Sequence, residues 1–288
     1  MLGRAVVEAC LDRGHQVARL AHEDLDITDA PAVDDVVDHY RPAVVVNCAA
    51  WTDVDGAEAD EPGATRLNNH GAALVAAAAA SVDAKVLHLS TDYVFDGSRR
   101  RPYFESDLPA PLSAYGRSKL AGETSVAVSN PKHMIVRTSW LFGLGRGNFV
   151  ETMLLAAAEQ PEVLVASDQV SCPTYTGHLA KALARLAEGE SFGIHHLVAS
   201  GYCSRFDYAQ EIFDQAGVET RVMGATSEMF ASAARRPAYS VLRSERPDAI
   251  TLPEWRRGLA AYLAERRRSR GEGGTTQAPA SSGQPEHR

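Results

Sequence analysis

A tyrosine and a lysine four residues apart, Tyr115 and Lys119, are the side chains in this sequence whose types and spacing best suit proton transfer. Residues at positions i and i+4 share one face of a helix, so the phenol and the ammonium would lie side by side. A nearby cation favours the phenolate and lowers the pKa of a tyrosine from its unperturbed value of about 10. The spacing therefore predicts a proton donor that works near neutral pH. The competing interpretation is an amphipathic pair on a helix surface.

A cluster of hydroxyls and a carboxylate precedes this pair by about 25 residues. The run 85–90 is mostly apolar and predicts a strand, and Thr91, Asp92 and Tyr93 follow it directly. Polar side chains at the carboxyl end of a parallel strand lie where α/β proteins bind their ligands. The sequence thus suggests a second component of a site, although Thr91 could equally be the hydroxyl of a turn that ends the strand.

Helix and strand patterns alternate over the first 150 residues. Apolar residues recur at helical spacing in the first segment and Gly14 ends it, so the chain opens inside a helix. Thr28 or Asp29 is expected to cap the second helix. The predicted helices are 2–10, 29–40, 71–80 and 115–128, and the predicted strands are 15–20, 43–47, 85–90 and 133–138. The alternation indicates right-handed crossovers and an α/β fold with a doubly wound parallel sheet, in which the apolar strand 43–47 is buried on both faces.

The pattern loosens after Asn148, which indicates a smaller substrate-binding lobe. It contains predicted helices ending at 159 and 186 and spanning 206–216, a loop at 168–175 and a strand at 194–198. We expect a dinucleotide-binding domain over 1–148, with 176–200 returning to it, and a substrate lobe over 149–262. The segment 263–288 is predicted to be a disordered tail, because large aliphatic and aromatic residues stop before Arg267 and Gly, Ser, Thr, Pro and Gln dominate.

Composition narrows the class of protein. Hydrophobic residues make up 45% and charged residues 23% of the 288 residues, which is typical of globular proteins, and a long apolar run that could cross a membrane is lacking. A net charge of −8 argues against nucleic acid or an anionic membrane as a partner. The four scattered cysteines form no C-x-x-C pair, so we expect isolated reduced thiols in a cytoplasmic protein.

Several segments resemble the short-chain dehydrogenase/reductase superfamily and, within it, the dTDP-4-dehydrorhamnose reductase family. The similarity lies in the segments around Thr91 and Tyr115 and in further motifs that reach almost to residue 262. These segments are 47–55, 90–97, 115–123, 137–143, 168–175 and 236–240. The family reduces the 4-keto group of a dTDP-linked 6-deoxyhexulose with NADPH and so forms dTDP-L-rhamnose for cell-surface polysaccharide.

The resemblance implies a role for each matching residue. Thr91 would hydrogen-bond the substrate carbonyl, Tyr115 would transfer the proton, and Lys119 would support Tyr115 and the nicotinamide ribose. Hydride addition places negative charge on the keto oxygen, so the convergence of a hydroxyl and a proton donor suits this reaction. Asp92, Tyr93 and Trp140 are further candidates for substrate contact. For Trp140 the alternative is a core residue that ends a buried strand.

The resemblance also places cofactor contacts after the early strands. Asp26 and Ile27 would lie near the adenine, with helix capping near Thr28 as the alternative for Asp26. The residues after strand 43–47 would lie beside the phosphates and ribose of the cofactor; they are Ala49, Ala50 and Thr52. NADPH needs a cation at its 2′-phosphate, for which Arg19 and His22 are candidates, and NADH stays open as the alternative.

The chain departs from the superfamily at its start. The superfamily fingerprint is a first strand followed by G-x-x-G-x-x-G, of which Gly3 matches only the last glycine. One explanation is a true start upstream of Met1, which we favour because Thr91, Tyr115 and Lys119 are all retained. The other is a chain that binds no dinucleotide in the usual way. Ser171, where the family usually carries glycine, is a smaller departure.

Alternative functions stay open at this stage. One is a related sugar-nucleotide reductase or epimerase. Another is a non-catalytic partner, because a regulatory subunit of methionine adenosyltransferase shares this fold. Mg²⁺ is compatible with the family, but the sequence has no cluster with metal-ligand spacing, and the acidic residues between 53 and 61 suit a solvated helix start. The sequence leaves a homodimer open as well.

Overall fold

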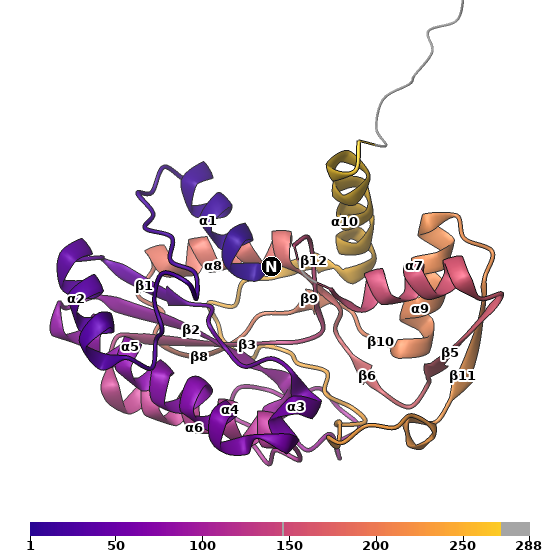
Figure 1. The fold of residues 1–288 in the computed structure, drawn as a ribbon, viewed down its shortest axis with the longest axis horizontal. Helices are drawn as coiled ribbons and strands as arrows, with labels where there is room; N and C mark the ends of the chain where they lie inside the picture. The colour runs from indigo at the N-terminus through magenta and orange to yellow at the C-terminus, as the bar shows by residue number, and fades with distance from the viewer. Residues whose placement is uncertain (146, 272–288) are drawn as a thin grey trace, which may run out of the picture.

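The computed structural model describes residues 1–145 and 147–271, and its centre is a parallel sheet. In this part of the chain the sheet has four strands in the order β1-β2-β3-β8 (Figure 1). They are β1 (Val44–Asn47), β2 (Lys85–Thr91), β3 (His133–Thr138) and β8 (Gly193–His196). The carboxyl ends of β2 and β3 align, with Thr91 opposite Thr138. The fold class is therefore the predicted one.

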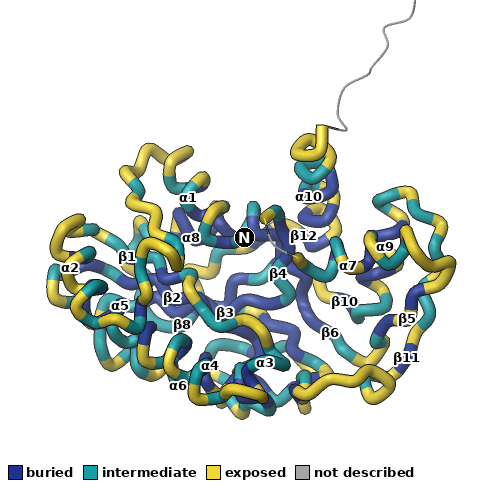
Figure 2. The backbone as a smooth tube through the Cα atoms, viewed as in Figure 1, coloured by how far each residue is buried: buried dark blue, intermediate teal, exposed yellow. Residues whose placement is uncertain are grey.

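Helices cover both faces of this sheet. On one face α1 (Leu2–Asp12) packs beside α8 (Thr176–Glu188), and their apolar residues share a core with those of β2 and β3. The opposite face is covered by α2 (Ala30–Tyr40), α5 (Ala72–Ser81) and α6 (Ala114–Ser129). The inner strands are therefore buried from both sides, as the dark tube in Figure 2 shows. The segment from α8 to β8 belongs to this first lobe, since β8 pairs with β3.

An irregular helical segment positions α6. It consists of α3 (Val54–Ala59), α4 (Glu61–Thr65) and the π-helical turn η1 (Arg66–Gly71), which runs directly into α5. The buried Asn68 in η1 accepts a hydrogen bond from the Trp51 amide at 2.8 Å and donates one to Ser118 Oγ at 2.9 Å. A Cβ at Gly122 would collide with the carbonyl of Asn68, so only glycine lets α6 cross so closely.

A buried ion pair fixes α6 to the strands as well. Glu123 of α6 accepts hydrogen bonds from Arg137 of β3 at 2.7 and 2.9 Å, and from Ser90 of β2 at 2.5 Å. Both charged side chains are almost fully buried. These hydrogen bonds fix the position of α6 relative to β2, and both elements carry candidate catalytic residues.

The predicted strand 15–20 is absent, which corrects the sequence interpretation. These residues form an irregular segment in which all but Val17 are exposed. Among the described residues β1 has no neighbour on its outer edge, so the segment has no strand with which to exchange hydrogen bonds. For the same reason Val44, Val45 and Val46 are only half-buried, and the expectation that this strand is buried on both faces was wrong.

The second lobe is built from short elements. Its helices are α7 (Phe149–Glu159) and α9 (Arg205–Ala216), and β5 (Glu162–Ala166) pairs in parallel with β11 (Arg221–Ala225), at the right of Figure 1. The remaining strands are two or three residues long: β4 (Leu141–Phe142), β6 (Val170–Ser171), β7 (Thr174–Tyr175), β9 (Ala199–Ser200), β10 (Cys203–Ser204) and β12 (Leu252–Glu254). An aromatic core that includes Tyr208 and Trp255 holds them together.

The predicted start of the tail, at residue 263, is too early. The last helix, α10 (Trp255–Ser269), extends seven residues into the predicted tail 263–288. Leu263 is buried, and Arg266 forms an ion pair with Glu151 at 2.7 Å, so this segment has partners that the composition does not reveal. The rest of the predicted tail from residue 272 lies outside the described residues. In the described part of the chain, the helices are too short or too polar to cross a membrane.

Candidate active site

Thr91 is the last residue of β2 and begins the short 3₁₀ helix η2 (Asp92–Val94). Its hydroxyl accepts a hydrogen bond from the Tyr93 amide at 3.1 Å and donates one to Asp92 Oδ1 at 3.1 Å. Thr91 thus does cap a turn at the strand end. The same contacts fix the hydroxyl at the carboxyl edge of the sheet, where ligands bind in this fold class.

Tyr115 lies in the first turn of α6, beside Thr91. The helix begins at this point because Ser113 Oγ accepts a hydrogen bond from the Gly116 amide at 3.1 Å. A Cβ at Gly116 would collide with the carbonyl of Tyr93, so glycine lets α6 start against η2. The rings of Tyr93 and Tyr115 meet edge to face with centroids 5.9 Å apart. Helix α6 therefore places the phenol of Tyr115 beside the end of β2.

The pKa of Tyr115 is raised, which corrects the expectation that Lys119 lowers it. Burial raises this pKa, and a hydrogen bond with Thr91 only partly opposes the rise. The ammonium of Lys119 lies 3.4 Å from His88 Nε2. Desolvation therefore dominates, the Asp92 carboxylate acts in the same direction, and the phenol stays protonated at neutral pH.

Lys119 is a buried cation with few partners. Burial lowers the pKa of Lys119 to about 8, although Glu123 and Cys48 favour the charged form. On the other side of His88, the side-chain amide of Asn47 lies 3.3 Å from His88 Nδ1. Burial and the neighbouring Lys119 hold the pKa of His88 well below its ordinary value, so the imidazole is neutral.

Asp92 is buried and bonded to hydroxyls from three segments. Besides Thr91, it accepts hydrogen bonds on Oδ2 from Ser171 at 3.1 Å and from Ser240 at 2.5 Å. Burial nonetheless raises the pKa of Asp92 to about 6. Since its carboxylate contacts protein hydroxyls and is 2% exposed, the expected direct contact with substrate is not supported. Asp92 instead joins the end of β2 to two loops of the second lobe.

Tyr93 and Trp140 are brought to the same edge. Tyr93 is buried against Tyr115, and burial raises the pKa of its phenol. Trp140 follows β3 with a φ of 42°, in the left-handed region that bulky residues rarely adopt. It is half-buried and packs against the aromatic core of the second lobe. Trp140 is therefore partly a core residue, in a backbone conformation that is typical of functional sites.

The expected cofactor residues fall into two groups. Ala49, Ala50 and Thr52 follow β1, next to the carboxyl end of β2, and Gly3 lies nearby, because a Cβ there would be 3.6 Å from Cys48 Cβ. Asp26 and Ile27 are placed differently. Asp26 accepts hydrogen bonds from the amide and hydroxyl of Thr28 in the turn before α2, whereas Asp29 caps the helix, and Ile27 is buried in the core beneath α2 and α5.

Comparison with known proteins identifies the family. A family model described as "RmlD substrate binding domain" matches residues 1–268. The chain belongs to the dTDP-4-dehydrorhamnose reductase family. A dTDP-4-dehydrorhamnose reductase of Streptomyces griseus is 43% identical over 268 residues, covering 91% of this chain and 88% of that protein. The spore coat polysaccharide biosynthesis protein SpsK of Bacillus subtilis is 39% identical, with 92% and 94% covered.

Solved structures of the reductase family have the same fold. The dTDP-4-dehydrorhamnose reductase of Bacillus anthracis, solved in complex with NADP, is 37% identical and superposes with a TM-score of 0.89. The match covers 92% of this chain and 95% of that one. The family and fold inferred from the motifs are thus confirmed.

In this member of the reductase family, the sequence analysis missed four residues beside the catalytic candidates. They are His88 on β2, Ser240 beside Asp92, and two arginines, Arg205 and Arg236, from the second lobe. Arg236 pairs with Asp55 of α3 at 2.7 Å. Ser240 and Arg236 belong to the family motif at 236–240, and this motif could have identified them as site residues. Arg205 has no such signal, because only the folding of α9 brings it close.

The acidic residues between 53 and 61 have structural partners. Asp53 and Asp60 cap α3 and α4, Glu58 accepts a hydrogen bond from the Ala114 amide, and Glu61 pairs with Arg117. Within residues 1–145 and 147–271, three or more potential ligands do not gather in a group that could hold a metal ion.

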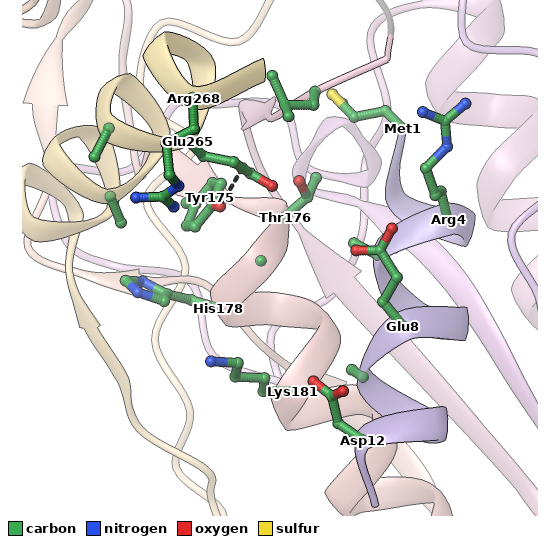
Figure 3. A pocket seen from close by; sticks show the side chains of 16 residues that line it. Met1, Arg4, Glu8, Asp12, Tyr175, Thr176, His178, Lys181, Glu265 and Arg268 are labelled. Atoms are coloured by element: carbon green, nitrogen blue, oxygen red, sulfur yellow. Dashed lines mark hydrogen bonds between the residues drawn. The ribbon is translucent and has the colours of Figure 1, made fainter. Parts of the chain in front are cut away.

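A pocket of about 560 Å³ lies where the first lobe meets Tyr175 and α10, which pack in the core of the second lobe (Figure 3). It is bounded by α1, α8 and α10, and charged side chains of both signs point into it, including Arg4, Glu8, Glu265 and Arg268. Its lining in the described chain does not include Thr91, Tyr115 or Lys119. We therefore place the reaction at the strand ends.

Proposed function

We propose that this protein reduces the 4-keto group of dTDP-4-dehydrorhamnose to dTDP-L-rhamnose, with NADPH as hydride donor. The observation that carries the proposal is the convergence of Thr91 and Tyr115 at the carboxyl end of β2, one helical turn from the buried Lys119. Membership of the reductase family supports the substrate, and the NADP complex of the Bacillus anthracis relative supports the cofactor. Free cysteines support a reducing cytoplasm as the location.

Tyr115 is the proton donor in this proposal. Its raised pKa keeps the phenol protonated until negative charge develops on the keto oxygen. The hydroxyl of Thr91 is held by the Tyr93 amide and turns its single proton from Asp92 Oδ1 to the same oxygen when the substrate binds. Transfer of the phenolic proton to that oxygen completes the reduction and leaves a phenolate.

The residues at the strand ends fit a nicotinamide dinucleotide. The Lys119 ammonium has three donors, and the described residues offer it one hydrogen-bonding contact, to His88. Ribose hydroxyls would supply the missing acceptors. Ala49 and Ala50 are small enough to let a ligand approach the backbone beyond β1. The cofactor, when bound, supplies the hydride, while Lys119 and the segment after β1 hold it against the end of β2.

Replacing Tyr115 with phenylalanine tests the proposed reaction. Tyr115→Phe removes only the proton that is transferred, so turnover should fall by about 10²- to 10⁴-fold while the thermal unfolding midpoint stays near that of the wild type. The loss of NADPH absorbance with dTDP-4-dehydrorhamnose measures the rate. Tyr40→Phe is the matched control, because Tyr40 is half exposed on α2, and it should leave the rate unchanged. A wild-type rate in Tyr115→Phe would contradict the assignment.

A further inference from the structure

Arg205 is a cation at the active-site edge to which the reaction described above gives no role. It is the first residue of α9, and its guanidinium carbon lies 3.7 Å from the ring centroid of Trp140 and 4.6 Å from that of Phe149. A guanidinium over an aromatic face is attracted by the negative face of the ring. Such stacking uses the flat face of the group and leaves its N–H edge available for hydrogen bonds.

The N–H groups of Arg205 have no hydrogen-bond or ion-pair partner within residues 1–145 and 147–271. Other arginines in that part of the chain without such a partner, including Arg19, Arg185 and Arg257, are solvent-exposed, whereas Arg205 is partly buried. Burial lowers the pKa of Arg205, although Tyr93, Tyr208 and Asp92 favour the charged form. A partly desolvated guanidinium with five unused donors calls for an anionic acceptor.

Its position relates Arg205 to the catalytic residues. Trp140, on which it stacks, is two residues beyond Thr138, and Thr138 pairs with Thr91. The charge of Arg205 also acts on Tyr93, where it opposes the rise in the pKa of the phenol. Arg205 therefore approaches the catalytic edge from the second lobe.

A second guanidinium near Tyr93, that of Arg236, provides an internal comparison. Arg236 also opposes the rise in the pKa of Tyr93, but Asp55 takes up its charge at 2.7 Å. Within the described residues, Asp55 thus pairs with one of the two cations beside Tyr93, whereas no carboxylate contacts the other. That difference favours Arg205 as the group that meets a negatively charged part of a ligand.

We propose that Arg205 binds the diphosphate of the nucleotide-sugar substrate and so discriminates nucleotide-linked sugars from uncharged ones. This inference rests on the proposed function. In that substrate the deoxyhexulose and the thymidine are uncharged, so the diphosphate is the part that a bare guanidinium recognises. Its oxygens accept hydrogen bonds from the N–H edge of Arg205, while Trp140 fixes the plane of the group.

Binding of dTDP and of thymidine to the full chain tests this role, because the two ligands differ by the diphosphate. In calorimetric titrations Arg205→Met should raise the Kd of dTDP by about tenfold to a hundredfold, as expected for lost hydrogen bonds to a charged group. The Kd of thymidine should not change. Methionine retains an apolar contact with Trp140. Arg205→Lys should recover part of the affinity, since it restores the charge but not the planar fork.

Arg256 offers a matched control for the change in charge. Its guanidinium also lies over a tryptophan, 4.3 Å from the ring centroid of Trp255, but it pairs with Glu211 at 2.8 Å and with Glu254 at 3.1 Å. Arg256→Met should therefore leave the Kd of dTDP unchanged.

Three outcomes would overturn the role of Arg205. They are equal affinity of the wild type for dTDP and thymidine, an unchanged preference for dTDP in Arg205→Met, and an equal loss of both ligands together with a lower unfolding midpoint. Turnover is measured separately. A wild type that prefers dTDP through Arg205 but does not reduce dTDP-4-dehydrorhamnose would refute the proposed function alone.

Discussion

Two buried polar clusters flank Thr91 and Tyr115, and they differ in how far the protein satisfies them. In the Asp92 cluster, formed by Thr91, Asp92, Ser171 and Ser240, three hydroxyls donate to one carboxylate. In the Lys119 cluster, formed by Asn47, His88 and Lys119, the ammonium has one contact at 3.4 Å. Buried polar groups in folded proteins are nearly always hydrogen-bonded. The difference indicates that the Asp92 cluster stabilises the fold, whereas the Lys119 ammonium has donors available for a ligand.

The two clusters also join different parts of the molecule. The Asp92 cluster connects the end of β2 to the loops at Ser171 and Ser240, and so holds the second lobe against the first. The Lys119 cluster lies wholly within the first lobe, between β1, β2 and α6. Changes to Asp92, Ser171 and Ser240 should therefore affect stability, and changes to Lys119 should affect chemistry, whereas Thr91 belongs both to its cluster and to the proposed reaction.

The largest expected effect separates activity from stability at Lys119. Lys119→Met should lower kcat/KM by about 10²-fold or more, because the cofactor ribose loses the cation that the proposed function assigns to it. The free energy of unfolding should hold or rise, since the variant no longer buries a poorly paired charge. Initial rates and urea unfolding measure the two quantities. Lys181→Met, at an exposed position on α8, should change neither.

The pH dependence of unfolding sharpens this prediction. The folded pKa of Lys119, about 8, lies below the ordinary value of 10.5, so the unfolded state binds more protons between these values. Wild-type stability should therefore rise relative to Lys119→Met as the pH increases from about 8 to 10.5. A variant that is strongly destabilised but fully active would reverse the proposed distinction between the clusters.

The next largest effect is a loss of stability at Asp92. Asp92→Ala leaves buried hydroxyls without their common acceptor and should lower the free energy of unfolding by about 3 kcal/mol, as measured with urea. Asp92→Asn keeps the shape and one acceptor oxygen and separates the effect of charge from that of packing. If Asp92→Ala unfolds like the wild type, the cluster does not hold the lobes together.

The charge of Asp92 gives its own pH signature. The folded pKa, about 6, lies above the ordinary value of 3.8, so the folded state binds more protons between these values. The contribution of Asp92 to stability is present below about pH 4 and is lost as the pH rises through 6. Stability relative to Asp92→Asn should fall over this window, and a constant difference would contradict the burial of an ionisable group.

The sequence predicted elements with a clear local pattern better than contacts between distant segments, for a physical reason. Long periodic segments such as 133–138 specify their strands locally, and motif similarity located Thr91, Tyr115 and Lys119. The predicted strand at 15–20 does not form, because a strand needs a partner to exchange hydrogen bonds with. No such partner lies beside β1 in the described chain. The sequence did not predict the stacking of Arg205 on Trp140 or the contact of Ser240 with Asp92. Both contacts form only when segments far apart in the sequence meet, and a local pattern does not record this.

The smallest expected effect concerns Ser171, at the centre of the Asp92 cluster. Ser171 is fully buried, and its hydroxyl donates to Asp92 Oδ2 at 3.1 Å. The hydroxyl of Ser240 donates a second hydrogen bond to the same oxygen at 2.5 Å. Ser171→Ala should thus lower the free energy of unfolding by only about 1 kcal/mol. It should also move the pH window of Asp92 upward, because a donor that favours the carboxylate is lost.

Ser240→Ala is the matched comparison for Ser171→Ala, since it removes the shorter of the two hydrogen bonds to the same oxygen. We expect the larger loss of stability in Ser240→Ala, and the loss in the double variant should differ from the sum because the hydroxyls share one acceptor and also contact each other at 3.0 Å. Strictly additive losses would mean that the two serines act independently. In that case the Asp92 cluster would be two separate contacts, and its contrast with the Lys119 cluster would rest on Asp92 alone.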